Sequence, residues 1–269
     1  GDHRDLHRLI RRQRQMCIRD SLEAGARCYN MRMAEEINRR LIDHCSNILF
    51  APTANCKENL EKESVVGEIY LTGDTMYDIF LEFKNKAEDS DILNMLGLSD
   101  REYGLLTLHR AENVDDPNRL RDILMGIAET KIDIIFPIHP RTKNRINEYK
   151  ISLHNANIKI IDPINYVEML KLLKHAKIVL TDSGGLQKEA FWSGIPCVTL
   201  RERTEWIETV QLGVNFLAGT TKETISSTIE KVLKNYDKIK AKFNHIKNPY
   251  GNGDASKKIV RYLKFKFAK

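Results

Sequence analysis

Between residues 103 and 235 the chain alternates short apolar runs with amphipathic helical patterns, and this constrains the fold more than any other feature. Runs such as Ile132–Ile138 and Lys177–Thr181 are typical of strands buried on both faces. The segment after Asp116-Pro117 repeats apolar residues at the spacing of one helix face. Buried strands separated by amphipathic helices form parallel sheets covered on both sides. The pattern therefore predicts a doubly wound α/β domain.

A shorter block, residues 21–72, shows the same texture with fewer strands. We predict a helix over Glu35–Ser46 and strands over Asn47–Ala51 and Ile69–Thr72. The apolar face expected for this helix comprises Ile37, Leu41, Ile42 and Cys45. The block is interpreted as the back half of a second α/β unit, with too few strands to close a sheet.

Composition excludes several classes of protein. No apolar run approaches the ~20 residues that span a bilayer, so no membrane segment is expected. The net charge is +6, and residues 1–20 supply half of it with six Arg and three Asp. The rest is nearly balanced, which argues against a nucleic-acid partner. The five cysteines form no metal-binding pattern and predict reduced thiols in a cytoplasmic protein.

The segment 181–189 carries the strongest local signal for a ligand. A buried strand ends at Thr181, then Ser183, Gly184 and Gly185 lead into a helix. Glycines allow close approach to a ligand, and the free N–H groups at a helix start attract phosphate. Glu189, further along the helix, is a candidate acceptor for a ribose diol. The alternative is a tight turn with a capping serine.

Other polar residues follow predicted strands. His109 and Arg110 come at the end of one strand, His139 follows the next, and Arg201 follows a third. Because parallel strands end at one edge of the sheet, a shared cleft is expected there. A structural histidine is the alternative for His109.

Residues 23–39 are dense in carboxylates and arginines, including Glu23, Arg27 and Glu35. They are interpreted either as a helix-surface charge network or as acid/base carboxylates tuned by nearby cations. Neither a P-loop nor a nicotinamide-binding fingerprint is present, so neither of those cofactor classes is expected.

Taken together, the chain resembles the non-hydrolysing UDP-N-acetylglucosamine 2-epimerases. The stretches that carry the resemblance, in family order from residue 22 onward, are LEAGARCYNMRMAEEINRRLIDHCS, LFAPT, TGDTMYD, LLTLHRAENVD, PIHPRT, LTDSGGLQKEA, LRERTEW and NPYGNGDAS. The resemblance implies two Rossmann-like domains of GT-B-like architecture, with a cleft between them.

On that template the N-terminal domain is incomplete. Residues 1–20 are expected to be foreign to the fold or disordered, with a basic arm as the alternative. Residues 21–74 correspond to a remnant of the N-terminal domain, and 75–243 to the C-terminal UDP-binding domain. Residues 244–269 correspond to a linker and a helix that packs back on the N-terminal domain. The family's catalytic aspartate lies in a Gly-Asp-Thr segment, but His3 follows Asp2 here, so Asp2 is given no catalytic role.

The resemblance also implies site residues. Glu23, Glu35 and His109 match catalytic positions. The substrate-binding positions implied are Arg110, His139, Met169, Ser183, Gly184, Gly185, Gln187, Glu189, Arg201, Thr204 and Glu205. Two positions depart from the family pattern: Met169 stands where many members have phenylalanine, and Trp206 stands where many have arginine.

The implied activity interconverts UDP-N-acetylglucosamine and UDP-N-acetylmannosamine by elimination and re-addition of UDP, for cell-surface polysaccharide precursors. No metal or other cofactor is implied, and the family is usually dimeric. The alternatives are a GT-B glycosyltransferase and an inactive UDP-binding fragment.

Overall fold

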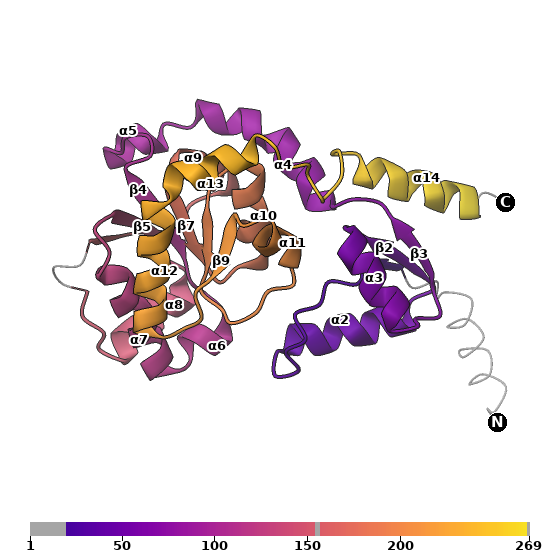
Figure 1. Cartoon of the computed structure of the whole chain (residues 1–269), viewed down its shortest axis with the longest axis horizontal. Helices are drawn as coiled ribbons and strands as arrows, with labels where there is room; N and C mark the ends of the chain where they lie inside the picture. Colours follow the sequence, from indigo (N-terminus) through magenta and orange to yellow (C-terminus); the bar gives the residue numbers. More distant parts are fainter. Residues whose placement is uncertain (1–19, 154–156, 268–269) are drawn as a thin grey trace, which may run out of the picture. The chain divides into compact units, whose positions relative to one another are not determined.

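The computed structural model describes residues 20–153 and 157–267 (Figure 1). Residues 1–19, Asp2 among them, lie outside the described residues, and so does the expectation stated for them. Asp20 itself begins strand β1. The chain divides into two compact units, residues 1–78 with 249–269 as unit 1, and residues 79–248 as unit 2.

Unit 2 is built on a six-stranded parallel sheet of order β6-β5-β4-β7-β8-β9. The central strands are buried because helices cover the sheet (Figure 1). This confirms the predicted α/β class. The bounds are β4 Tyr103–Thr107, β5 Asp133–Pro137, β6 Ile158–Ile161, β7 Ile178–Thr181, β8 Cys197–Thr199 and β9 Asn215–Leu217.

Helices connect these strands. Their bounds are α5 Ile92–Leu96, α6 Ala111–Val114, α7 Pro117–Ala128, α8 Pro140–Glu148, α9 Tyr166–His175, α10 Gly184–Trp192, α11 Ile207–Gln211, α12 Lys222–Lys234 and α13 Tyr236–Phe243. Asp116 caps α7 by accepting from the backbone N–H groups of Asn118 and Arg119. Gly126 lets α7 and α12 touch, because a Cβ there would lie 2.6 Å from the carbonyl oxygen of Lys222.

Unit 1 contains a three-stranded parallel sheet of order β1-β2-β3. Its elements are β1 Asp20–Leu22, α2 Ala34–Cys45, β2 Ile48–Ala51, α3 Ala54–Lys62, β3 Glu68–Leu71 and α14 Ala255–Phe267. Helix α4, Thr75–Lys86, begins in unit 1 and leads, through the short 3₁₀ turn Ala87–Asp89, into unit 2.

Helix α14 packs on the sheet of unit 1. Ile259 joins Ile48 and Phe50 in a buried cluster, with Tyr70 and Tyr262 against it. The rings of Tyr70 and Tyr262 lie 3.9 Å apart, and both hydroxyls donate to Glu68 on β3. The C-terminal helix therefore completes the core of the first unit.

The expected orientation of α2 is wrong. Ile37, Leu41 and Ile42 are 38%, 60% and 52% exposed, whereas Glu36 and Asp43 are buried. The two carboxylates face inward because they accept hydrogen bonds from the 21–29 segment. The apolar face of this helix therefore lies on the surface of unit 1.

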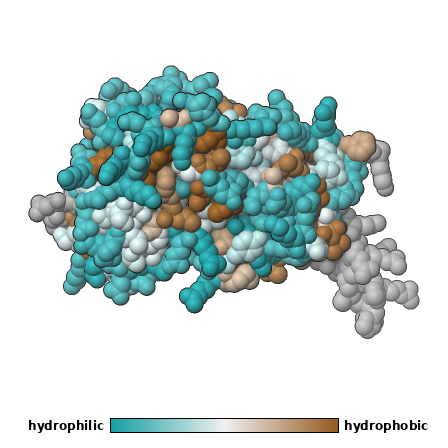
Figure 2. All heavy atoms as spheres, viewed as in Figure 1, coloured by the Kyte–Doolittle hydropathy of each residue, from teal (hydrophilic) through white to brown (hydrophobic). Residues whose placement is uncertain are grey.

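The surface carries other apolar side chains as well. Figure 2 shows apolar patches among hydrophilic atoms on the face in view. Val260, on α14, is 49% exposed, and Phe265 is 85% exposed. Within residues 20–153 and 157–267, no helix has the length and apolar character needed to cross a membrane.

Candidate functional site

The start of α10 follows directly on β7 and is organised by Ser183. The Ser183 hydroxyl caps the helix by accepting from the N–H of Leu186 at 3.4 Å. Gly184 and Gly185 form the first turn, where backbone N–H groups lack partners within the helix. This is the geometry that favours a bound phosphate.

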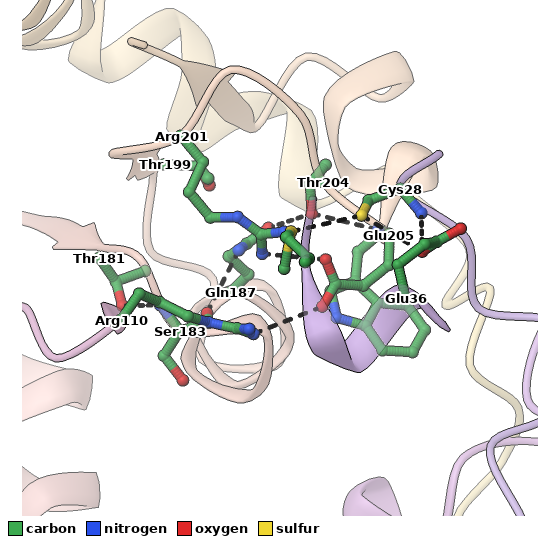
Figure 3. Close-up of polar contacts among 12 residues, drawn as sticks. Cys28, Glu36, Arg110, Thr181, Ser183, Gln187, Thr199, Arg201, Thr204 and Glu205 are labelled. Carbon is green, nitrogen blue, oxygen red and sulfur yellow. Dashed lines mark hydrogen bonds and ion pairs between the residues drawn. The ribbon is translucent and has the colours of Figure 1, made fainter. Parts of the chain in front are cut away.

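Two cations and one carboxylate lie beside this turn (Figure 3). Arg201 pairs with Glu205 at 2.9 Å, and Arg110 approaches the same carboxylate at 3.7 Å. Gly184 makes this possible, because a Cβ there would lie 2.7 Å from Oε1 of Glu205. The structure therefore brings Arg110, Gly184, Arg201 and Glu205 together.

Gln187 ties α10 to the next loop. Its amide oxygen accepts from the Thr204 hydroxyl at 2.6 Å and from Asn215 at 3.2 Å. Its amide nitrogen donates to the Ser183 carbonyl at 3.2 Å. Gln187 holds the loop in place through these hydrogen bonds. Because its side chain is fully buried, it exposes no surface to a ligand.

Glu189 is buried on α10 and receives a 2.8 Å hydrogen bond from the hydroxyl of Tyr166 on α9. Burial raises the pKa of the Glu189 carboxyl, and the hydrogen bond from Tyr166 only partly offsets it. The pKa of Tyr166 is also raised, by burial and by this carboxylate. Met169, on the same helix as Tyr166, is half-buried.

Trp206 is buried beside the same helix. The ammonium of Lys188 lies 4.1 Å from the centre of its indole ring, and both side chains are almost fully buried. The position where many family members have an arginine is thus filled by an indole with a cation stacked on it.

His109 lies beyond the end of β4, with its side chain 41% exposed. Its Nδ1 atom is 3.6 Å from Oδ1 of the buried Asp182, and its ring centre is 6.1 Å from that of His139. His139 is exposed at the start of α8, where its Nδ1 accepts from the N–H of Arg141. His139, His109, Ser183 and Arg201 follow β5, β4, β7 and β8, which are consecutive neighbours in the sheet.

Glu23 and Glu35 both belong to unit 1, and both are exposed. Glu23 follows β1 with a backbone φ of 59°, a left-handed conformation that is uncommon for a residue other than glycine. It borders a small hollow at the carboxyl ends of the three strands, together with Pro52, Thr72 and Asp74. Such backbone strain is often found at functional sites.

Arg27, Glu36, Asp43 and Glu63 form a largely buried structural network. Arg27 lies 2.8 Å from Asp43 and 2.9 Å from Glu63. Burial opposes its charge, but hydrogen bonds to Glu63 and Asp43 raise the pKa of Arg27 overall. Glu36 accepts from the backbone N–H groups of Cys28 and Tyr29. The charge-network interpretation therefore describes Arg27 and Glu36.

Asp182 and Tyr166 are site residues that the sequence did not reveal as such. Asp182 is fully buried and accepts from the backbone N–H groups of His109 and Arg110. Its place, directly between a buried strand and Ser-Gly-Gly, was the available signal. Among the described residues, no group of three or more His, Cys, Asp or Glu side chains is arranged to hold a metal ion.

Comparison with known proteins decides the family. Residues 22–264 match the family model described as UDP-N-acetylglucosamine 2-epimerase. The chain belongs to the UDP-N-acetylglucosamine 2-epimerase family. The UDP-N-acetylglucosamine 2-epimerase of Methanocaldococcus jannaschii is 44% identical over 255 residues, covering 91% of this chain and 68% of that protein. The UDP-2,3-diacetamido-2,3-dideoxy-D-glucuronate 2-epimerase of Pseudomonas aeruginosa is 41% identical, covering 90% and 66%.

Solved structures agree with this assignment. The crystal structure of the M. jannaschii UDP-GlcNAc 2-epimerase with UDP-GlcNAc and UDP has a TM-score of 0.80 at 42% identity, covering 91% of this chain and 68% of that one. Phytolacca americana UGT2 has a TM-score of 0.55 at 13% identity and covers 86% and 55%, which shows a shared fold alone. The architecture is therefore that of the GT-B-like epimerases.

Proposed function

We propose that this protein interconverts UDP-N-acetylglucosamine and UDP-N-acetylmannosamine. The observation that carries the proposal is the 42% identity, at a TM-score of 0.80, to an epimerase crystallised with UDP-GlcNAc and UDP. The glycosyltransferase alternative rests on a relative that shares the fold alone.

The reaction inverts C2 of the sugar, whose hydrogen has no neighbouring ketone to acidify it. In the proposed sequence, a carboxylate removes the C2 proton while the C1–O bond to UDP breaks, which leaves a glycal and UDP. Proton delivery to the other face of C2 and re-addition of UDP to C1 then give the epimer. The steps balance without an oxidant, because the proton removed from C2 is replaced by another proton and UDP is added back to C1.

We assign the proton transfers at C2 to Glu23 and Glu35. Both are exposed carboxylates in the family positions, and the left-handed backbone at Glu23 supports a functional role for it. A pair of such groups supplies the base and the acid that inversion needs.

We assign the stabilisation of departing UDP to unit 2. The first turn of α10, with Ser183, Gly184 and Gly185, suits the diphosphate. Arg110 approaches Glu205 beside that turn and supplies positive charge to the leaving oxygen. The half-exposed His109 supplies positive charge or a proton to the same oxygen. Arg201 and Thr204 support this arrangement through Glu205 and Gln187.

We assign nucleoside recognition to α9 and α10. Glu189, held by Tyr166, is the proposed acceptor for the ribose hydroxyls. Met169, which is half-buried on the same helix as Tyr166, is proposed to contact the uracil. His139 is proposed to contact the diphosphate.

The test is turnover of UDP-N-acetylglucosamine by the purified protein in D2O, followed by proton NMR. We expect the manno epimer to appear and deuterium to enter at C2, since the proton comes from solvent in the second half of the reaction. His109→Ala should abolish most turnover while UDP affinity changes less than a few-fold. His175→Ala is the matched control, because His175 also lies beside an aspartate, Asp100, at 3.0 Å. Free UDP with a new glycoside would show transfer instead, and UDP binding without turnover would show the inactive fragment.

We further propose a cytoplasmic homodimer. The four described cysteines, Cys28, Cys45, Cys56 and Cys197, are not joined in disulfides, which fits a reducing compartment. Family resemblance supports the dimer. Sedimentation equilibrium should give twice the mass of the 31.1 kDa chain, and a monomer across all concentrations would contradict it.

A further inference from the structure

Asp182 is a fully buried carboxylate that joins three neighbouring strand ends. It follows β7, and its Oδ2 accepts from the N–H groups of His109 at 3.1 Å and Arg110 at 2.8 Å, beyond β4. The same oxygen accepts from Nδ2 of Asn113 at 3.1 Å, and that amide also donates to the carbonyl of Leu200, beyond β8. The backbone that carries His109 is therefore fixed to the segment that begins α10.

The second oxygen of Asp182 is placed differently. Oδ1 receives a longer contact from the N–H of His109, at 3.2 Å, and lies 3.6 Å from Nδ1 of the His109 ring. A buried carboxylate favours a proton on a nitrogen this close to it, because the alternative is a lone pair that faces the negative charge. The side chain of His109 is 41% exposed, so part of the ring is open to solvent.

His139 provides an internal contrast. Its ring centre lies 6.1 Å from that of His109, but its Nδ1 accepts a hydrogen bond from the N–H of Arg141 at 3.2 Å. A nitrogen that accepts a hydrogen bond cannot carry a proton, so neutral His139 has its proton on Nε2. The environments of the two rings thus favour opposite tautomers.

We propose that Asp182 is a positioning residue that keeps a proton on Nδ1 of His109, so that Nε2 is the nitrogen that gains and loses a proton. This inference rests on the proposed function for its catalytic meaning, because there Nε2 would face the departing UDP. The neutral ring would accept a proton at Nε2, and the protonated ring would donate one from it. Neighbouring His139, with the opposite tautomer, has no free acceptor nitrogen and cannot substitute.

The direct test is long-range 1H–15N correlation NMR on the 15N-labelled whole protein at alkaline pH, where histidines are neutral. His109→Gln and His139→Gln assign the signals. We expect the unprotonated nitrogen to be Nε2 in His109 and Nδ1 in His139. A wild-type His109 that carries its proton on Nε2 would overturn the proposal, whatever becomes of any variant.

Asp182→Asn tests the causal link. It replaces one carboxylate oxygen by an amide donor, so the His109 tautomer should shift toward Nε2–H while that of His139 stays unchanged. We expect kcat to fall about ten- to hundredfold with KM changed less than about threefold. Thr107→Val, which removes the 2.6 Å hydrogen bond between Thr107 and Thr181 in the same strand pair, is the control and should leave the tautomer and kcat unchanged.

The outcomes remain separable. If His109 keeps the same tautomer in folded Asp182→Asn, or if the variant changes KM alone, the positioning role is wrong. If the tautomers are as expected but the wild-type protein produces no epimer, the proposed function fails while the assignment of Asp182 stands.

Discussion

The guanidinium of Arg201 lies 2.9 Å from the carboxylate of Glu205, and their side chains are only 3% and 1% exposed. The pair sits beside the first turn of α10, where Arg110 approaches the same carboxylate. A buried pair of this kind depends on both partners, because either charge left alone in the interior is costly.

Removing one member of this pair should therefore destabilise the protein strongly. We expect Glu205→Ala to lower the free energy of unfolding by ~3–5 kcal/mol in urea titrations. The double variant Arg201→Met, Glu205→Leu should lose much less than the sum of the two single variants. Strictly additive losses would mean that the two charges do not stabilise one another.

Gly184 should be required for UDP binding because a side chain there would clash with its neighbours, and not because of its backbone conformation. In Gly184→Ala the new methyl would lie 2.7 Å from Oε1 of Glu205 and 3.1 Å from Nε1 of Trp206, so the start of α10 must shift. We expect UDP affinity to fall about tenfold or more by isothermal titration, a change of ~1.4 kcal/mol or greater. Ser193→Ala, at the other end of the helix, is the control. Unchanged affinity in Gly184→Ala would place the diphosphate elsewhere.

The Glu189 carboxyl should make stability depend on pH in a defined direction. Burial raises its pKa in the folded protein above the usual 4.5. The folded state therefore binds the proton more tightly than the unfolded state does, and the associated stability, full below pH 4.5, is lost as pH rises through the folded pKa. Glu189→Gln should remove this loss, so its stability relative to wild type should increase between mildly acidic and neutral pH. Thermal unfolding at several pH values checks this, and a constant difference would contradict it.

Substitution of two leucines of unit 1 should change stability to very different extents. Leu41 on α2 is 60% exposed, whereas Leu49 on β2 is fully buried. We expect Leu41→Lys to change the free energy of unfolding by less than ~0.5 kcal/mol and to reduce binding of an apolar dye. Leu49→Ala should cost ~2–5 kcal/mol. A large loss in Leu41→Lys would show that a partner or another segment covers this face in solution.

The sequence predicted the strands, and the turn from β7 into α10, because both depend on local pattern. Strands β5 and β7 differ from their predicted ranges by at most one residue at either end. Ser183 and Gly184 were recognisable because a helix start after a buried strand has a local signature.

The errors arose where long-range contacts outweighed local pattern. The apolar spacing of Ile37 and Leu41 predicted the inward face of α2, but Glu36 and Asp43 occupy that face because their partners lie in the 21–29 segment. Asp182 was missed as a site residue for the same reason, since its partners at His109, Arg110 and Asn113 are about 70 residues away in the chain.

The contact between Glu68 and Lys266 joins residues 198 positions apart in the chain. Unit 2 is inserted between them, so a ribosome must finish all of residues 79–248 before α14 can dock on Ile48 and Phe50. During synthesis, unit 2 can fold as soon as it emerges, whereas unit 1 waits with one sheet face uncovered. Unit 2 therefore matures first, although translation of unit 1 begins before it.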